Sequence, residues 1–277
     1  MGSRMAANLQ KAGHDLVVYN RSQDKADELV QNGATRAHSP EEVAQQCRVV
    51  ITMLSTPEAV EEVALGQDGF LKALPGNSLW VNTSTINPSF AKKMAEITLK
   101  MGHRYLDAPV AGSLIPAEKG ELIFLLGGEE KDVTEVQPLL DVMGSKTVHV
   151  GGHSLGSAMK MSNNMLMGLT MAAFAEAVKL GTALGITQEK MFQTLLNGPI
   201  AAPFLKAKES KLTQQDFSPE FPLEWMHKDL HLASVTAYEQ GISMPSLNSG
   251  KELYAMAKET GHAQDDYSYI FQFLQQK

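Results

Sequence analysis

A lysine and an asparagine one helical turn apart have the residue types and the spacing for proton-transfer chemistry. Lys160 and Asn164 lie in the segment Gly156-Ser157-Ala158-Met159-Lys160-Met161-Ser162-Asn163-Asn164. Their i, i+4 spacing predicts that both side chains project from one face of a helix. Three methionines flank the pair: Met159, Met161 and Met165. Such an apolar setting disfavours the charged form of a lysine and lowers its pKa, so that it can donate a proton near neutral pH. The alternative interpretation is a surface lysine near a helix start.

Two further polar clusters accompany this pair. The first is Asp107-Ala108-Pro109-Val110-Ala111-Gly112-Ser113, in which a strand-like run ends in a glycine turn. Backbone N–H groups exposed in such a turn can bind a carboxylate, although the same pattern also occurs in an ordinary turn after a strand. The second cluster is Phe221-Pro222-Leu223, which His227-Lys228-Asp229-Leu230 follows.

Polar residues also follow several predicted strands in the first half of the chain. Asn20-Arg21-Ser22 follows one of them, at the place where NAD-specific enzymes usually carry an acidic residue. Arginine there suits a ribose 2′-phosphate, and the alternative is a helix N-cap, Ser22, after a surface arginine. Met53-Leu54-Ser55 and Ser84-Thr85 end two more strands, at the edge where open α/β sheets bind ligands.

The elements that must position these residues divide the chain into two predicted domains. Residues 1–152 alternate strand-like and helical patterns, which indicates a doubly wound, Rossmann-type α/β domain with a parallel sheet. The expected strands are 15–19, 48–53, 78–82, 105–107 and 122–126, and the expected helices are 24–32, 57–65 and 88–101. Residues 153–277 have helical periodicity and predict an all-α domain, which begins with one long connecting helix over 155–184.

The opening segment resembles the end of a dinucleotide-binding fingerprint. Met1-Gly2-Ser3-Arg4 starts a helical pattern ahead of the first expected strand, and Gly2 matches the last glycine of G-x-G-x-x-G. The strand and the first two glycines that precede this helix in such folds are absent from the sequence. We therefore expect a sheet without its first strand, either because the start is internal to a longer gene product or because the strand has been lost. Met1 and Gly2 are then expected next to the cofactor. The alternative is a start codon that happens to precede a glycine.

Composition excludes several classes of function. The 277 residues are enough for two domains, and 43% hydrophobic and 20% charged residues are typical of a globular protein. A net charge of -7 argues against nucleic-acid binding, because that function requires a basic face. Cys47 is the single cysteine and cannot form an internal disulfide, which favours a reducing compartment and a cytoplasmic location.

Membrane and metal functions are not expected either. The most apolar stretch, 165–175, is shorter than the ~20 residues of a membrane span and predicts a buried helix. The N-terminus has no extended apolar region, so no signal peptide is expected. Of the eight histidines, only His227 and His231 share helical i, i+4 spacing, and a metal site needs more ligands than that.

Taken in their order along the chain, these motifs resemble the β-hydroxyacid dehydrogenase family, which includes 3-hydroxyisobutyrate dehydrogenases, tartronate semialdehyde reductases and glyoxylate/succinic semialdehyde reductases. The resemblance covers essentially the whole chain and implies that Lys160, in G-x-x-x-K-x-x-N-N, is the catalytic lysine. Together with the strand-end positions, it implies substrate contacts by Thr85, Gly112, Ser113, Asn164, Phe221 and Asp229. It implies cofactor contacts by Met1, Gly2, Asn20, Arg21, Ser22, Met53, Leu54, Ser55, Thr85 and Lys228.

The implied activity is an NADPH-dependent reduction of a small aldehyde-acid, such as glyoxylate or succinic semialdehyde, by a homodimer or homotetramer. NAD(H) remains possible, and the alternatives are a 3-hydroxyisobutyrate or tartronate semialdehyde type of dehydrogenase and a non-catalytic scaffold. Imine reduction is disfavoured because that branch has a different residue at the position of Lys160. One departure affects the substrate: the family turn reads V-S-G-G or S-G-S, whereas this chain has Ala111 in place of the serine that contacts the substrate carboxylate.

Overall fold

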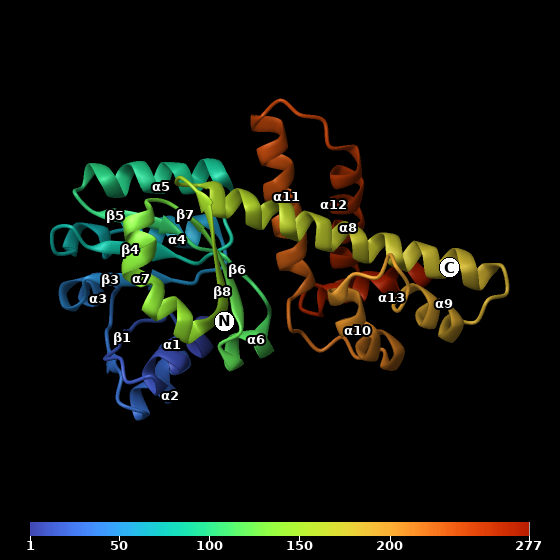
Figure 1. The fold of residues 1–277 in the computed structure, drawn as a ribbon, viewed down its shortest axis with the longest axis horizontal. Coiled ribbons are helices and arrows are strands. Elements are labelled where there is room, and N and C mark those ends of the chain that lie inside the picture. Colours follow the sequence, from blue (N-terminus) through green and yellow to red (C-terminus); the bar gives the residue numbers. More distant parts are fainter. Residues whose placement is uncertain (277) are drawn as a thin grey trace. The chain divides into compact units, whose positions relative to one another are not determined.

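The computed structural model describes residues 1–276 and divides the chain into two compact units, one over Met1–Met161 and one that begins at Ser162 (Figure 1). The sequence pattern placed a domain boundary after residue 152. The boundary between the two compact units falls inside a long helix, α8 (Leu155–Ala183), which therefore contributes residues to both units.

Unit 1 alternates strands and helices, as predicted. Its helices are α1 (Gly2–Lys11), α2 (Asp27–Gln31), α3 (Pro40–Gln46), α4 (Pro57–Leu65), α5 (Pro88–Lys100), α6 (Leu114–Lys119) and α7 (Glu130–Met143), with 3-10 turns η1 (Gln23–Ala26) and η2 (Leu71–Ala73). Its strands are β1 (Val17–Val18), β2 (Thr35–Arg36), β3 (Val49–Thr52), β4 (Leu79–Asn82), β5 (Arg104–Asp107), β6 (Val110–Ala111), β7 (Leu122–Gly127) and β8 (Gly144–Gly151).

The main sheet of unit 1 has six strands in the order β3-β4-β5-β7-β6, with β8 paired to β7. Strands β3, β4 and β5 are parallel, and β8 is parallel to β7, whereas β7 is antiparallel to β5 and β6. Strands β1 and β2 form a separate two-stranded parallel sheet. The predicted α/β class is therefore confirmed, with the correction that the sheet is mixed at β7.

Helices cover both faces of this sheet. One apolar core joins α1, α6 and α7 to residues of β4, β5 and β7, and the other joins α3, α4 and α5 to the opposite faces of β3, β4 and β5 (Figure 1). Trp80 lies at the centre of the second core, edge to face with Phe70 and Tyr105 at ring-centroid distances of 5.1 and 4.9 Å. Strand β4 is buried along its whole length, which is why its sequence reads as a continuous apolar run.

Local sequence signals explain where several helices start. Ser39 and Thr56 precede α3 and α4, and their side-chain oxygens accept the backbone N–H groups of Glu42 and Ala59 at 3.1 and 3.2 Å. Proline follows each cap at the first helical position, where its missing N–H costs no hydrogen bond. Helix α4 therefore has the predicted bounds, 57–65.

Unit 2 is helical in the described residues, as predicted. Its elements are the later part of α8, then α9 (Gln188–Leu195), α10 (Pro203–Gln214), α11 (Leu223–Glu239), α12 (Pro245–Ala257), η3 (Lys258–His262), η4 (Tyr267–Tyr269) and α13 (Ile270–Gln275). Glycine allows close helix contacts here, because a Cβ on Gly168 of α8 would lie 2.8 Å from Sδ of Met226 on α11. One apolar core connects α8 to all the other helices of the unit.

Helix α8 is the one helix in the described chain that is long and apolar enough to cross a membrane by length and composition alone. Its most apolar window has a mean hydropathy of 1.2, and 39% of that window is buried inside the structure. The sequence expectation rested on residues 165–175 alone, which are too few to span a membrane, whereas the apolar window of α8 is longer. A single helix of this kind is weak evidence for a membrane span, since core helices of globular proteins pass the same test.

Candidate active site

A polar layer lies at the carboxyl edge of the parallel strands in unit 1. Thr52, Asn82 and Asp107 are the last residues of β3, β4 and β5, and the strand register pairs Thr52 with Asn82 and Asn82 with Asp107. All three are buried. Polar residues at the ends of neighbouring parallel strands mark the edge where open α/β sheets bind their ligands.

Hydrogen bonds connect this layer to two of the predicted cofactor segments. The Thr52 hydroxyl donates to Oδ1 of Asn82 at 3.1 Å, and the same oxygen accepts the backbone N–H of Ser84 at 3.1 Å. The Ser84 hydroxyl oxygen in turn accepts the backbone N–H of Leu54 at 2.9 Å. The structure therefore brings the segments 53–55 and 84–85 together, with Ser55 exposed at the edge.

The same network extends below the edge to residues that the sequence analysis did not select. Nδ2 of Asn82 donates to the Tyr105 hydroxyl at 3.2 Å, and the Trp80 indole N–H donates to Thr52 at 2.9 Å. Burial raises the pKa of Tyr105 well above its usual value, and the nearby Asp107 adds to that rise. A polar residue at the end of each apolar strand was the signal that could have identified this layer.

The start of helix α1 suits an anionic group. A Cβ on Gly2 would lie 3.4 Å from Cβ of Met53, so the first turn of α1 approaches the end of β3. The first turn of α1 contains no acidic residue and includes Arg4. Backbone N–H groups at a helix start favour phosphate, so Met1 and Gly2 fit the pyrophosphate of a dinucleotide.

The segment Asn20-Arg21-Ser22 follows β1 and is exposed. Nδ2 of Asn20 donates to the backbone oxygen of Ser22 at 2.8 Å, which closes a tight turn around Arg21. Ser22 precedes the 3-10 turn η1, but its side chain makes no capping hydrogen bond. Ser22 therefore occupies the N-cap position after a surface arginine, as in the alternative interpretation, although it makes no side-chain cap. The exposed arginine at this turn is also compatible with a role at the 2′-phosphate of NADP(H).

Lys160 lies near the start of α8 and is 7% exposed, so the interpretation as a surface lysine is wrong. The start of the helix is held by Asp107, whose oxygens accept the backbone N–H groups of Ser154 and Ser157 at 2.8 and 2.7 Å. Burial raises the pKa of Asp107, and these two hydrogen bonds oppose the rise.

The predicted carboxylate turn has a backbone that only glycine adopts without strain. Gly112 has φ +121°, and a Cβ there would lie 2.9 Å from Cδ2 of Leu122. Ser113 precedes α6, and its hydroxyl makes no capping hydrogen bond to that helix. Ala111 closes β6 and pairs with Ile123 of β7, so the position of the missing serine is at the end of a strand. The polar groups that this turn offers are therefore the backbone N–H of Gly112 and the hydroxyl of Ser113.

Three predicted residues of unit 2 form one cluster, in which two are buried and Lys228 is half-buried. Nδ2 of Asn164, on α8, donates to Oδ2 of Asp229, on α11, at 2.6 Å. Nζ of Lys228 lies 3.1 Å from the other carboxylate oxygen of Asp229. Asn164 and Asp229 are 1% and 2% exposed, so the amide is held in one orientation by a charge-assisted hydrogen bond in a dry environment.

Phe221 is fixed by a separate buried network in unit 2. Its backbone N–H donates to Oδ2 of Asp266 at 3.2 Å, and its ring lies 5.8 Å from that of Tyr267. Asp266 is fully buried and also accepts Nζ of Lys208 at 2.9 Å. Asp266 and Lys208 were missed by the sequence analysis, because their positions are 58 residues apart and neither belongs to a local motif.

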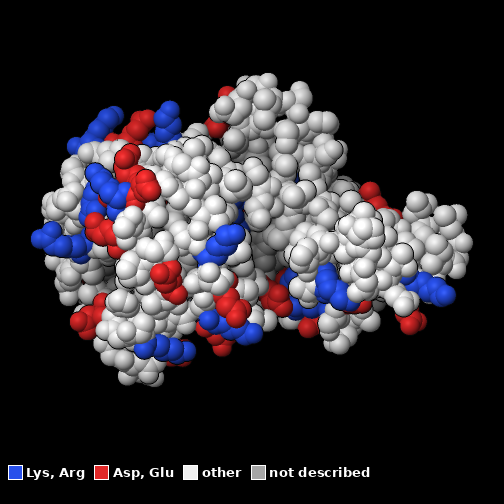
Figure 2. All heavy atoms as spheres, in the orientation of Figure 1, with Lys and Arg blue, Asp and Glu red and all other residues white. Residues whose placement is uncertain are grey.

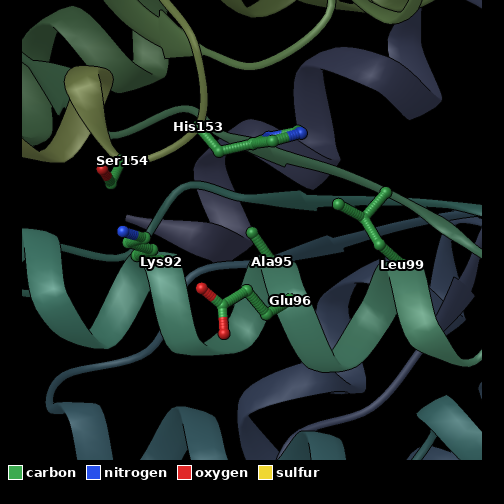
Figure 3. A pocket seen from close by; sticks show the side chains of 6 residues that line it. All are labelled: Lys92, Ala95, Glu96, Leu99, His153 and Ser154. Carbon is green, nitrogen blue, oxygen red and sulfur yellow. The ribbon is translucent and has the colours of Figure 1, made fainter.

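A surface cavity of about 360 Å³ lies beside the start of α8 and is lined by Lys92, Ala95, Glu96, Leu99, His153 and Ser154. Figure 3 shows its α5 residues on one face of that helix, opposite His153 and Ser154. The predicted site residues lie elsewhere.

In residues 1–276, neither a cluster of metal ligands nor, on the face of unit 1 that Figure 2 displays, a basic surface stands out. Over residues 1–276, no group of three or more His, Cys, Asp or Glu side chains is arranged to hold a metal ion. On the face of unit 1 that Figure 2 displays, acidic and basic side chains are interspersed.

Comparisons with known proteins agree with this arrangement. The family model of the NAD binding domain of 6-phosphogluconate dehydrogenase matches residues 1–151, and that of the NAD-binding domain of NADP-dependent 3-hydroxyisobutyrate dehydrogenase matches residues 154–274. The chain is 36% identical to glyoxylate/succinic semialdehyde reductase 2, chloroplastic, of Arabidopsis thaliana, over 99% of this chain and 76% of that protein. It is 34% identical to the probable mitochondrial 3-hydroxyisobutyrate dehydrogenase of Dictyostelium discoideum, over 99% of this chain and 88% of that protein.

A solved structure supports the same conclusion. The 3-hydroxyisobutyrate dehydrogenase of Mycobacterium tuberculosis, solved with L-serine, has a TM-score of 0.91 and 29% sequence identity, and the match covers 100% of this chain and 96% of that one. The chain therefore belongs to the β-hydroxyacid dehydrogenase family and is an NAD(P)-dependent dehydrogenase or reductase.

Proposed function

We propose that this protein reduces a small aldehyde-acid, such as glyoxylate or succinic semialdehyde, to the hydroxy acid with NADPH, and that Lys160 donates the proton. The observation that carries the proposal is the burial of Lys160, a titratable residue that Met159 and Met161 flank in helix α8. Desolvation disfavours the ammonium form of such a residue, which suits it to release a proton. The 36% identity to a protein named glyoxylate/succinic semialdehyde reductase supports this class of substrate.

The chemistry requires a hydride at the carbonyl carbon and a proton at its oxygen, and NADPH supplies the hydride when bound. Lys160 releases its proton to the oxygen as the negative charge develops there. Thr85 and Asn164 orient that oxygen, and Asn164 is prepared for this task by its hydrogen bond to Asp229. Asp229 in turn holds Lys228, which we assign to the cofactor.

Substrate selection rests on the turn after β6. The Gly112 backbone N–H and the Ser113 hydroxyl bind the substrate carboxylate, and Phe221 contributes an apolar wall. Ala111 supplies no hydroxyl where other members of the family carry a serine. We therefore propose that this protein binds the substrate carboxylate through Gly112 and Ser113 alone.

NADP(H) is the preferred cofactor in this proposal because Arg21 is exposed in the turn after β1. A guanidinium recognises a phosphate through charge-assisted hydrogen bonds, whereas an NAD-specific site carries an acidic residue at this place. NAD(H) remains the alternative, together with the dehydrogenase reactions named for the relatives from Dictyostelium discoideum and Mus musculus.

A substrate panel tests this function. Glyoxylate, succinic semialdehyde, tartronate semialdehyde and methylmalonate semialdehyde are each offered with NADPH and with NADH, and kcat/KM is measured for the eight combinations. The proposal expects the highest value with NADPH and either glyoxylate or succinic semialdehyde. A maximum with methylmalonate semialdehyde and NADH favours the 3-hydroxyisobutyrate alternative, and saturable NADPH binding without turnover of any aldehyde favours the non-catalytic one.

We further propose that the protein acts as a homodimer or homotetramer. Helix α8 is apolar around most of its circumference, and part of that apolar surface is in contact with water. Leu166 and Leu180 are each 64% exposed. A second copy of the chain would remove this apolar surface from water. A cytoplasmic location stays a prediction, because the names of the relatives include chloroplastic and mitochondrial proteins.

A further inference from the structure

We infer that Asp107 is a positioning residue, which fixes the start of helix α8 on the end of strand β5 and thereby sets the place of the Lys160 amine. This inference rests on the proposed role of Lys160 as the proton donor. It concerns residues of unit 1 only. Asp107 itself touches neither substrate nor cofactor in this account.

Asp107 replaces the local cap that a helix start normally has. The first backbone N–H groups of a helix have no partner within the helix, and the residue before the helix usually accepts one of them with its own side chain. Ser154 occupies that position with φ +74°, outside the extended conformation of an ordinary cap. The two oxygens of Asp107 instead accept the N–H groups of Ser154 and Ser157, which lie 47 and 50 residues further along the chain.

Two glycines bring the helix start directly onto the backbone of the sheet. A Cβ on Gly156 would lie 2.4 Å from the backbone oxygen of Leu125 and 2.7 Å from that of Asp107. A Cβ on Gly127 would lie 2.6 Å from Oδ1 of Asp107 and 2.8 Å from the backbone nitrogen of Gly156. Any side chain at either position would push the helix away from the strands, so this contact has little freedom.

The electrostatics of the contact favour an aspartate. The N-terminal end of a helix carries a partial positive charge, and α8 is 29 residues long. The carboxylate of Asp107 is fully buried against that end, where water screens the attraction least. An amide in the same place retains one acceptor, but it turns an N–H₂ group toward one of the two backbone donors.

The position of the Asp107 carboxylate affects the proposed reaction because helix α8 connects it to Lys160. Lys160 follows Ser157 by three residues, so about 4.5 Å of helix axis separates the held N–H group from the proposed acid. Asp107 also lies in the strand that leads into β6 and the Gly112 turn, five residues later in the chain. One side chain therefore fixes the proton donor relative to the turn that we assign to the substrate carboxylate.

The test combines Asp107 and Lys160 substitutions in the full-length protein. We expect Asp107→Ala to lower kcat about 100-fold, because a misplacement on the order of 1 Å has an effect of that size, while the Kd for NADPH stays unchanged. In the Lys160→Ala background, the same change at Asp107 should lower kcat little further. Asp132→Ala is the matched control, because it removes another buried carboxylate of unit 1, which pairs with Arg104, and it should leave kcat unchanged.

Asp107→Asn provides a second variant in case Asp107→Ala does not fold, and we expect it to lower kcat without changing the Kd for NADPH. Equal losses of kcat from Asp107→Ala or Asp107→Asn in both backgrounds would overturn the inference, as would an unchanged kcat in Asp107→Asn. Either result leaves the proposed function standing if Lys160→Ala alone is nearly inactive. A fully active Lys160→Ala variant contradicts the proposed function itself.

Discussion

At the scale of single residues, the proposed chemistry depends on two polar side chains that helix α8 carries one turn apart. Lys160 and Asn164 share a helix face because they are one turn apart, and the structure places both in α8. In the layer of Thr52, Asn82 and Asp107, the sequence marks each polar strand end but does not predict that the three side chains are neighbours. Its members are neighbours only because three strands pair in one register, and register is set by the packing of the whole sheet.

Arg21 carries the residue-scale prediction about the cofactor. Replacing Arg21 with Ala should raise the KM for NADPH about 10- to 100-fold, since a hydrogen bond to a charged group contributes about 1.5–3 kcal/mol, and should leave the KM for NADH unchanged. Arg48→Ala is the matched control. Arg48 is also exposed, but it precedes strand β3, whereas Arg21 follows strand β1. Equal KM values for NADPH in the two variants would contradict the assignment of Arg21 to the 2′-phosphate.

At the scale of elements, the sequence predicted the buried and the amphipathic segments. It did not predict strand β8 or the direction of strand β7. Helix α4 and the apolar strand β4 have strong local patterns, and their predicted bounds agree closely with the structure. Strand β8 was missed because its residues are mostly half-buried or exposed and include several polar ones, so it lacks the apolar run of a central strand. The antiparallel direction of β7 was missed because direction depends on the connection through β6 and α6, which single-strand patterns do not encode.

The loop that holds Phe221 gives a prediction about the stability of unit 2. Lys208→Met should lower the free energy of unfolding by about 3–5 kcal/mol, because it leaves the fully buried Asp266 without its cationic partner. The control is Lys206→Met, which removes an exposed pair with Glu209 that contributes about 0–1 kcal/mol. Urea denaturation followed by circular dichroism measures both. Equal losses of stability in the two variants would show that the buried pair does not hold this loop.

At the scale of the whole molecule, the order of motifs predicted the family although several single motifs are weak. Two family models and relatives that span nearly the entire chain confirm that interpretation. We propose that a few side chains, among them Arg21 and Ala111, decide the preferred cofactor and the substrate. The overall pattern, which relatives with different names share, does not determine them.

The exposed side of α8 is the surface that the proposed oligomer would bury. Light scattering on the purified protein should give a mass of two or four chains, and Leu180→Glu should lower that mass toward one chain because a charge then replaces an exposed leucine. Leu184→Glu tests the same surface just beyond the end of the helix. A monomer in the unsubstituted protein would contradict the proposed oligomer.

One buried histidine, His103, predicts how the stability of the molecule depends on pH. Burial lowers the pKa of His103 below its usual 6.5, so unfolding is accompanied by proton uptake at mildly acidic pH. The contribution of His103 to the free energy of unfolding is therefore fully present above pH 6.5. It is lost as the pH falls from 6.5 through the lowered pKa of the folded protein. The free energy of unfolding, measured at about pH 7.5 and about pH 5.5, should fall less in His103→Gln than in the unsubstituted protein. An identical fall in both would contradict this role.

Single-turnover reduction of the preferred aldehyde-acid measures whether Lys160 donates the proton. With saturating NADPH, Lys160→Ala should slow hydride transfer by about 10²- to 10⁴-fold, the usual contribution of a general acid, while the Kd for NADPH stays unchanged. Lys179→Ala, on the same helix α8 with Nζ bound to the backbone of Leu274, is the control and should react at the unsubstituted rate. A Lys160→Ala variant that transfers hydride as fast as this control would contradict the account.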